Sequence, residues 1–293
     1  MNRISRNLAI SIAFLLVMKV EAQISKKERS ALVDLFEATN GAEWTNSWNL
    51  DAPVKEWYGV YVENNQVVHL KLSKNNLQGD LPFTLKKLQH LEVLDLSFNK
   101  ITGLLPRTLA ELGDLRILKL EMNTIKGDLS WDFSNWSKLE ELNLFNNFLD
   151  GSIPQTVGLA KNLRILNLSS NNLSGTLPKS IEKLTQLEIL GLMGNRFEGE
   201  INIDFSNMDG LFELVLSHNA FEGPLPNSIQ GLLKLKFVQL QGNKFETFRG
   251  LENIRSKELI AFDSDNDLLD RKYSNTSLSR SRMADTKFEE EKH

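Results

Sequence analysis

Asparagine recurs at a fixed spacing along this chain, and its carboxamide is the polar group that repeats most regularly. Eight asparagines lie 24 residues apart, at Asn75, Asn99, Asn123, Asn147, Asn171, Asn195, Asn219 and Asn243. A carboxamide has two N–H donors and one carbonyl acceptor, so it can satisfy backbone groups that have no other partner. Aspartate could not donate in this way, and leucine could do neither. We therefore expect an internal hydrogen-bonded ladder of asparagines rather than a catalytic centre.

A second set of side chains has the composition of a binding surface. It combines three large apolar residues with three charged ones, all at positions predicted to face outward on neighbouring repeats: Asp95, Phe98, Lys119, Glu121, Met122 and Phe145. An apolar centre with a charged rim is typical of a protein-binding patch. Alternatively, the charges pair across neighbouring strands and Phe98 packs over an edge. We favour binding because clustered exposed aromatic residues usually mark an interaction site.

The elements that position these residues follow from a 24-residue pattern, L-x-x-L-x-L-x-x-N-x-L-x-G-x-L-P, as in "LNLSSNNLSGTLP" at 166–178. The L-x-L core alternates with period two and predicts a short strand with both leucines inward. Glycine then permits a turn, and proline keeps the outer arc extended. The prediction is an α/β repeat solenoid of about eight 24-residue repeats, curved so that its parallel β-sheet is concave.

Two repeats replace the proline segment in the same way. "GDLSWDFSN" at 127 and "GEINIDFSN" at 199 share Asp-Phe-Ser-Asn and lie three repeats apart. Duplication of a three-repeat block would produce this, and so would convergent packing by Phe133 and Phe205.

The ends of the chain differ from the repeats. Residues 1–22 are predicted to be a cleaved signal peptide, because Arg3 and Arg6 precede an apolar run from Leu8 to Met18. A membrane anchor is the alternative, but this run is shorter than the roughly 20 residues that a span needs. Residues 23–66 are predicted to be a helical N-terminal cap, 67–246 the repeats, 247–270 a capping coil and 271–293 a disordered tail.

The N-terminal cap combines a helix with a cluster of tryptophans. Ser25 and Glu28 have the spacing of a capping box, and Gly41 is predicted to stop the helix. Trp44, Trp48 and Trp57 follow, and they could form either a carbohydrate platform or a plug over the first coil. We favour the plug, because a cap without disulfides needs bulky apolar anchors.

With its L-x-G-x-L-P outer arc, "NLSSNNLSGTLPKSIEKLTQLEIL" resembles the plant-type extracellular leucine-rich repeat of receptor-like-kinase ectodomains and polygalacturonase-inhibiting proteins. The resemblance extends from about residue 25 to 269 and implies extracellular recognition of a protein, peptide or glycan. Plant caps of this type normally carry paired cysteines, whereas this chain has none. In that respect its cap is similar to those of secreted bacterial and algal relatives. No kinase motif follows the repeats.

Composition and motifs argue against several other functions. The net charge of −4 disfavours nucleic acid as a partner. The usual hydrolase and phosphate-binding motifs are missing, so we expect no enzyme and no cofactor. The acidic run at 263–267 lacks the glycine and glutamate of a calcium loop, so we expect no metal. We predict a secreted recognition module without membrane insertion after signal cleavage; the alternative is a structural or adhesive surface protein. The oligomeric state is left open.

Overall fold

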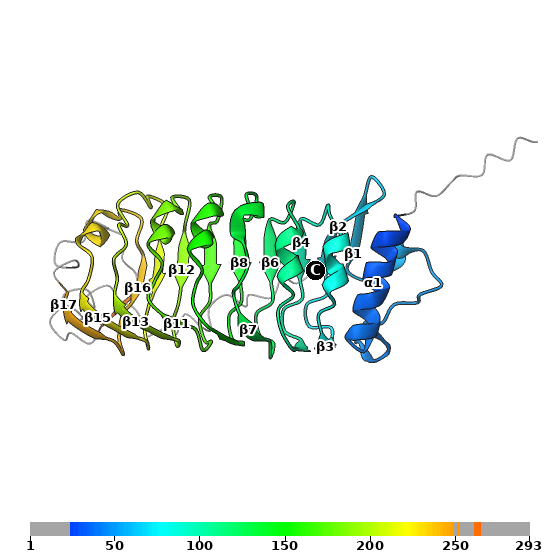
Figure 1. Ribbon diagram of the computed structural model, residues 1–293, viewed down its shortest axis with the longest axis horizontal. Coiled ribbons are helices and arrows are strands. Elements are labelled where there is room, and N and C mark those ends of the chain that lie inside the picture. Colours follow the sequence, from blue (N-terminus) through cyan, green and yellow to red (C-terminus); the bar gives the residue numbers. More distant parts are fainter. Residues whose placement is uncertain (1–23, 249–250, 252–260, 265–293) are drawn as a thin grey trace, which may run out of the picture.

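The computed structural model describes residues 24–248, 251 and 261–264. The chain forms an elongated stack of coils in sequence order, with the N-terminal helix at one end (Figure 1). The predicted signal peptide and tail lie outside the described residues, as does most of the predicted capping coil. No helix of the described part is long and apolar enough to cross a membrane.

One long sheet runs through the stack. Its strands follow in the order β1 (Val60–Glu63), β2 (Gln66–Lys71), β4 (Val93–Asp95), β6 (Ile117–Lys119), β8 (Glu141–Asn143), β10 (Ile165–Asn167), β12 (Ile189–Gly191), β14 (Glu213–Val215), β16 (Phe237–Gln239) and β18 (Ala261–Asp263). β1 pairs antiparallel with β2, and all the other pairs are parallel. Leu94 pairs with Leu118, and Leu118 with Leu142, so equivalent leucines align and are fully buried. A slip by one residue would turn these leucines out to solvent.

Short strands also form on the far side of each turn, where the sequence predicted only an extended arc. They are β3 (Gln78–Asp80), β5 (Lys100–Thr102), β7 (Lys126–Asp128), β9 (Phe148–Asp150), β11 (Ser174–Gly175), β13 (Arg196–Glu200), β15 (Ala220–Pro224) and β17 (Lys244–Thr247). They pair as β3-β5, β7-β9 and β11-β13-β15-β17. Gly103 shows why glycine recurs here: its φ is +70°, and a Cβ would approach the Asp80 carboxylate to 2.4 Å.

The back of the stack carries short 3-10 helices: η3 (Phe83–Lys87), η4 (Arg107–Glu111), η5 (Phe133–Asn135), η6 (Gln155–Leu159), η7 (Lys179–Lys183) and η8 (Asn227–Gly231). Proline is the residue that precedes five of them, as at Pro82, where its fixed φ of −75° suits the entry. In the two repeats without this proline, an aspartate takes over the turn. The backbone N–H of Ser134 donates to Asp132 at 3.0 Å, and that of Ser206 donates to Asp204 at 2.9 Å.

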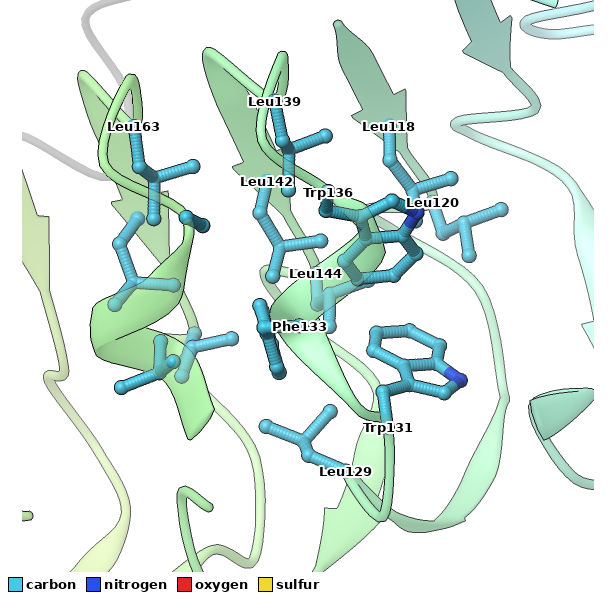
Figure 2. Close-up of a cluster of buried hydrophobic side chains, with 14 of the residues drawn as sticks. Leu118, Leu120, Leu129, Trp131, Phe133, Trp136, Leu139, Leu142, Leu144 and Leu163 are labelled. Carbon is cyan, nitrogen blue, oxygen red and sulfur yellow. The ribbon is translucent and has the colours of Figure 1, made fainter. Parts of the chain in front are cut away.

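The repeat that contains η5 holds a large aromatic cluster in the core. Trp131, Phe133 and Trp136 lie between the leucines of neighbouring strands (Figure 2). The Trp131 and Trp136 rings are 5.0 Å apart at 70°, and those of Phe133 and Trp136 are 5.2 Å apart at 88°. The edge-to-face arrangement fills the space where the outer arc departs from the pattern. Phe205 is buried in the corresponding position three repeats later.

The N-terminal end is closed by α1 (Lys26–Ala38). The predicted capping box is confirmed, since Ser25 and Glu28 exchange hydrogen bonds. The predicted stop at Gly41 is wrong by one residue: Asn40 takes the left-handed conformation, φ 56°, which asparagine tolerates. Gly41 instead begins η1 (Gly41–Glu43), which is followed by η2 (Val54–Glu56).

The cap tryptophans pack as a plug. Trp44, Trp48 and Trp57 are all buried, and Trp48 lies 4.8 Å from each of the other two rings. Each indole N–H donates to a backbone carbonyl within the cap. These rings therefore offer no open face on which a sugar could stack.

Candidate ligand-binding face

The asparagines lie inside the coils and tie each repeat to the one before it. Asn123 donates from Nδ2 to the carbonyls of Leu96 and Leu120 at 3.1 and 3.0 Å, and its Oδ1 accepts from the N–H of Ile101 at 3.0 Å. Bonds at the same sequence offsets recur at Asn99, Asn147, Asn171, Asn195, Asn219 and Asn243. Asn75 instead accepts from the N–H of Asn46, which joins the first repeat to the cap.

The outward side of the ten-stranded sheet, called the sheet face below, carries the candidate binding residues. Asp95 and Lys119 are paired in register on β4 and β6. Glu121 follows β6, and its carbonyl accepts from the N–H of Phe98 at 2.9 Å. The carbonyl of Phe145 accepts from the N–H of Met122 at 2.8 Å. The six predicted residues therefore occupy three successive coils.

Lys119 and the three carboxylates of Asp95, Glu121 and Glu141 form one cluster, and the ammonium of Lys74 lies 5.4 Å from the centre of the Phe98 ring beside it. The ammonium of Lys119 lies 3.9 Å from Glu121 Oε1 and 3.8 Å from Glu141 Oε1. Burial opposes the charge on Lys119, but Glu141, Glu121 and Asp95 outweigh it and raise the pKa of Lys119. One ammonium therefore serves three carboxylates. Glu141, which the sequence analysis did not select, belongs to this cluster.

Glu121 occupies a different place from the one expected. The sequence suggested a solvated rim, but Glu121 is only 4% exposed and is flanked by the half-buried Met122 and Phe145. Among the described residues, its Oε2 atom has no hydrogen-bond partner. Burial is the largest influence on this carboxyl and raises its pKa to about 7, against the lowering effect of Lys119.

The apolar residues are half-buried rather than fully exposed. Phe98 and Met122 precede the asparagines of their repeats and adopt left-handed backbone angles, with φ of 55° and 59°. The equivalent position is left-handed in the other repeats too, at Lys74, Asn146, Ser170, Gly194, His218 and Gly242, and only the two glycines adopt this conformation without strain. A bulky side chain there costs on the order of 1 kcal/mol. The left-handed turn therefore belongs to the scaffold, and Phe98 and Met122 are the two positions where it carries a large apolar side chain.

A further apolar column on the sheet face was missed. The first residue of most strands points outward next to the inward leucine, and it is apolar at Val93, Ile117, Ile165, Ile189 and Phe237. The signal was available in the sequence as a β-branched residue before the first leucine of the L-x-L core. It was missed because outward positions were sought only from the L-x-L core onward, and not before its first leucine. This column extends the apolar surface beyond the predicted patch.

Ion pairs line one edge of the sheet face. Arg116 contacts Glu140 at 2.7 Å, and Arg164 contacts Glu188 at the same distance. In these ion pairs each charge already has a partner within the chain, and the side chains are partly exposed. They are therefore poor candidates for ligand contacts. Among the residues that the structure describes, no group of three or more His, Cys, Asp or Glu side chains could hold a metal ion.

Comparison with known proteins identifies the repeats. Family models for the leucine-rich repeat match residues 65–125, 138–159, 162–184 and 210–232. These segments are leucine-rich repeats. The predicted solenoid class is thereby confirmed, while the number of repeats stays a prediction. Protein STRUBBELIG-RECEPTOR FAMILY 2 of Arabidopsis thaliana is 30% identical over 100 residues, which cover 33% of this chain and 14% of that protein.

Solved structures with the same fold include plant peptide receptors. The crystal structure of PEPR1-AtPEP1 matches with a TM-score of 0.69 and 27% identity, over 75% of this chain and 32% of that one. The plant peptide hormone receptor RGFR1 in complex with RGF2 matches with a TM-score of 0.60 and 29% identity, over 64% of this chain and 30% of that one. A leucine-rich repeat protein of Leptospira interrogans matches with a TM-score of 0.54 and 29% identity, over 66% of this chain and 47% of that one. The resemblance to plant receptor ectodomains is confirmed, although this chain spans about a third of those receptors.

Proposed function

We propose that this protein is a secreted, non-catalytic recognition module that binds an extracellular peptide or protein through the sheet face. The observation that carries the proposal is the cluster of Asp95, Lys119, Glu121 and Glu141 beside half-buried apolar side chains. Such a surface offers both apolar area to cover and charged groups to orient a partner. Two structural relatives, PEPR1 with AtPEP1 and the peptide hormone receptor RGFR1 with RGF2, are complexes, which supports the choice of ligand class.

A glycan ligand has less support. The three cap tryptophans, which were the best candidates for stacking against sugar rings, are buried in the plug. A peptide can instead place successive side chains along the parallel strands, which are spaced about 4.8 Å apart. We therefore favour a peptide or protein partner.

The test is retention of a partner from the extracellular fraction of the source organism by the immobilised full chain. The patch variant carries Asp95→Lys, Lys119→Glu and Phe145→Ala. A matched control variant carries the same types of change at exposed positions away from the sheet face: Glu198→Lys, Lys100→Glu and Phe83→Ala. We expect the control variant to retain the partner and the patch variant to lose it, with both keeping the circular dichroism spectrum of the parent. Equal retention by the two variants would place binding elsewhere.

A structural or adhesive role is the alternative, and one observation favours it. Leu104 is 70% exposed and Phe148 is 51% exposed, and both pair with Lys126 across adjacent coils. These two exposed apolar side chains, one on each side of Lys126, could join two copies of the chain. This role predicts a concentration-dependent dimer in sedimentation experiments, which Leu104→Ser together with Phe148→Ser would abolish. A monomer at all concentrations would remove its support.

A further inference from the structure

We propose that the sheet face recognises a positively charged side chain, lysine or arginine, of its peptide ligand, and that Glu121 is the residue that receives it. This inference rests on the proposed function and names the chemistry of the ligand. It depends on three observations: the local excess of negative charge, the absence of a partner for one oxygen of Glu121, and the apolar surroundings of that carboxylate.

The charges of the cluster do not balance. Asp95, Glu121 and Glu141 are carried by three adjacent coils, and Lys119 is the cation among them. Its distances of 3.9 Å to Glu121 and 3.8 Å to Glu141 are too long for hydrogen bonds. With these four groups ionised, the cluster carries two negative charges in excess, and one remains when Lys71, in register with Asp95 on β2, is counted. A ligand with one positive charge would be attracted to it.

The carboxylates differ in how well they are satisfied. Asp95 accepts from the backbone N–H of Ser97 at 3.1 Å and from its hydroxyl at 2.6 Å. Glu121 is almost fully buried, and its Oε2 has no donor. A buried ionised oxygen without a hydrogen-bond partner is strongly unfavourable, because it has lost its hydration and no protein donor replaces the water. Oε2 of Glu121 is therefore the carboxylate oxygen of this cluster that lacks a donor among the described residues, and a rotation of the side chain toward the sheet face would let a ligand supply one.

The surroundings of Glu121 suit a long cationic side chain. Met122 follows it in sequence, and Phe145 occupies the equivalent position on the next coil. Lysine and arginine have apolar stems that can pack on such residues while the charged end reaches the carboxylate. The guanidinium of arginine can also stack on an aromatic ring. A neutral donor would satisfy Oε2 but would leave the excess charge in place.

The experiment uses a displayed library of random dodecapeptides, selected in parallel on four forms of the full chain. These are the parent, Glu121→Gln, the matched exposed control Glu198→Gln, and the patch variant described above. Glutamine keeps the size of the side chain and removes its charge. We expect lysine or arginine to be enriched at one position of the peptides selected on the parent and on Glu198→Gln. That enrichment should disappear on Glu121→Gln.

Affinities of one selected peptide then test the contact directly. At pH 8, Glu121→Gln should weaken binding at least about tenfold, and replacing the cationic residue of the peptide by uncharged citrulline should weaken it similarly. The two changes together should cost little more than either alone. Burial raises the pKa of Glu121 to about 7, so affinity for the parent should also fall from pH 8 to pH 5. That pH dependence should be lost in Glu121→Gln.

The possible failures are separable. Peptides that bind the parent but not the patch variant, and that show no cationic preference, would overturn the inference while supporting the proposed function. Equal affinity of a selected cationic peptide for the parent and Glu121→Gln would also overturn it. If no peptide binds the parent better than the patch variant, both the inference and peptide binding at the sheet face are refuted.

Discussion

Replacing Glu121 by glutamine should make the protein more stable at neutral and alkaline pH. In the fold, the pKa of Glu121 is raised from 4.5 to about 7. Each pKa unit corresponds to about 1.36 kcal/mol, so holding the ionised carboxylate in its buried place costs roughly 3 kcal/mol. Because the side chain is only 4% exposed, solvent screening reduces this figure little. Glutamine has the same shape and cannot ionise, so it removes the penalty.

The sign of the effect sets its pH window. The folded pKa lies above the unfolded value, so the fold binds the Glu121 proton more tightly than the unfolded chain does. The contribution of this group to stability is therefore fully present below about pH 4.5 and is lost as the pH rises to about 7. Glu121→Gln should match the parent at pH 4 and exceed it by roughly 3 kcal/mol at pH 8.

Urea unfolding at pH 4, 5.5 and 8, followed by circular dichroism, measures this difference. Glu198→Gln is the matched control, because Glu198 is exposed on β13 and its replacement should have little effect at any of these pH values. If Glu121→Gln were no more stable than the parent at pH 8, the carboxylate would have a partner in solution. The reasoning from its burial would then be refuted.

Three further predictions concern the scaffold. Asn147→Asp should destabilise the chain by about 2–4 kcal/mol at pH 7, because a carboxylate would face the carbonyls to which the amide donates. The same change at the exposed neighbour Asn146 should be nearly neutral. The urea concentrations at the unfolding midpoints of the two variants test this difference. Trp48→Ala should cost about 3–5 kcal/mol by emptying the centre of the plug, and thermal unfolding should show the loss; an unchanged midpoint would contradict the buried position of this ring. Gly158→Ala should lower the free energy of unfolding by about 1–3 kcal/mol, because the added Cβ would lie 2.3 Å from the Ser180 carbonyl oxygen. Gly231→Ala is the control, because a Cβ there would have no neighbouring atom within 4 Å. It should be neutral or slightly stabilising in the same thermal unfolding assay.

The repeat fold could be predicted because its determinants are local and recur. Leucines with period two and one asparagine in every 24 residues indicate both the strand and the register between strands. The second set of short strands could not be predicted in this way. These strands are short, and some centre on the turn glycine, as Gln78–Asp80 and Lys126–Asp128 do; they pair because neighbouring coils bring them together. The role of the proline was also incomplete, since it introduces a 3-10 helix as well as an extended arc.

The candidate site could be predicted less completely than the scaffold. The outward positions of Asp95 and Lys119 followed from alternation along the strand. The burial of Glu121 did not, because it lies beyond the end of β6 (Ile117–Lys119), where the alternation no longer applies. The left-handed backbone angles of Phe98 and Met122 could not be predicted either, because the repeat pattern gives residue types and not backbone dihedral angles.

One departure from the scaffold's own rules is informative because it lies in the candidate site. The left-handed position of Phe98 and Met122 recurs in every repeat, but the carboxylate of Glu121 is buried with no donor to its Oε2 among the described residues. This arrangement reduces the stability of the free protein. Strain and unsatisfied polar groups persist most often where function requires them. A cationic ligand residue would provide Glu121 with its missing partner, so part of what the free fold loses would be recovered in the complex. Stabilisation of the parent by a cationic peptide should therefore exceed that of Glu121→Gln, and this comparison connects the stability measurements to recognition.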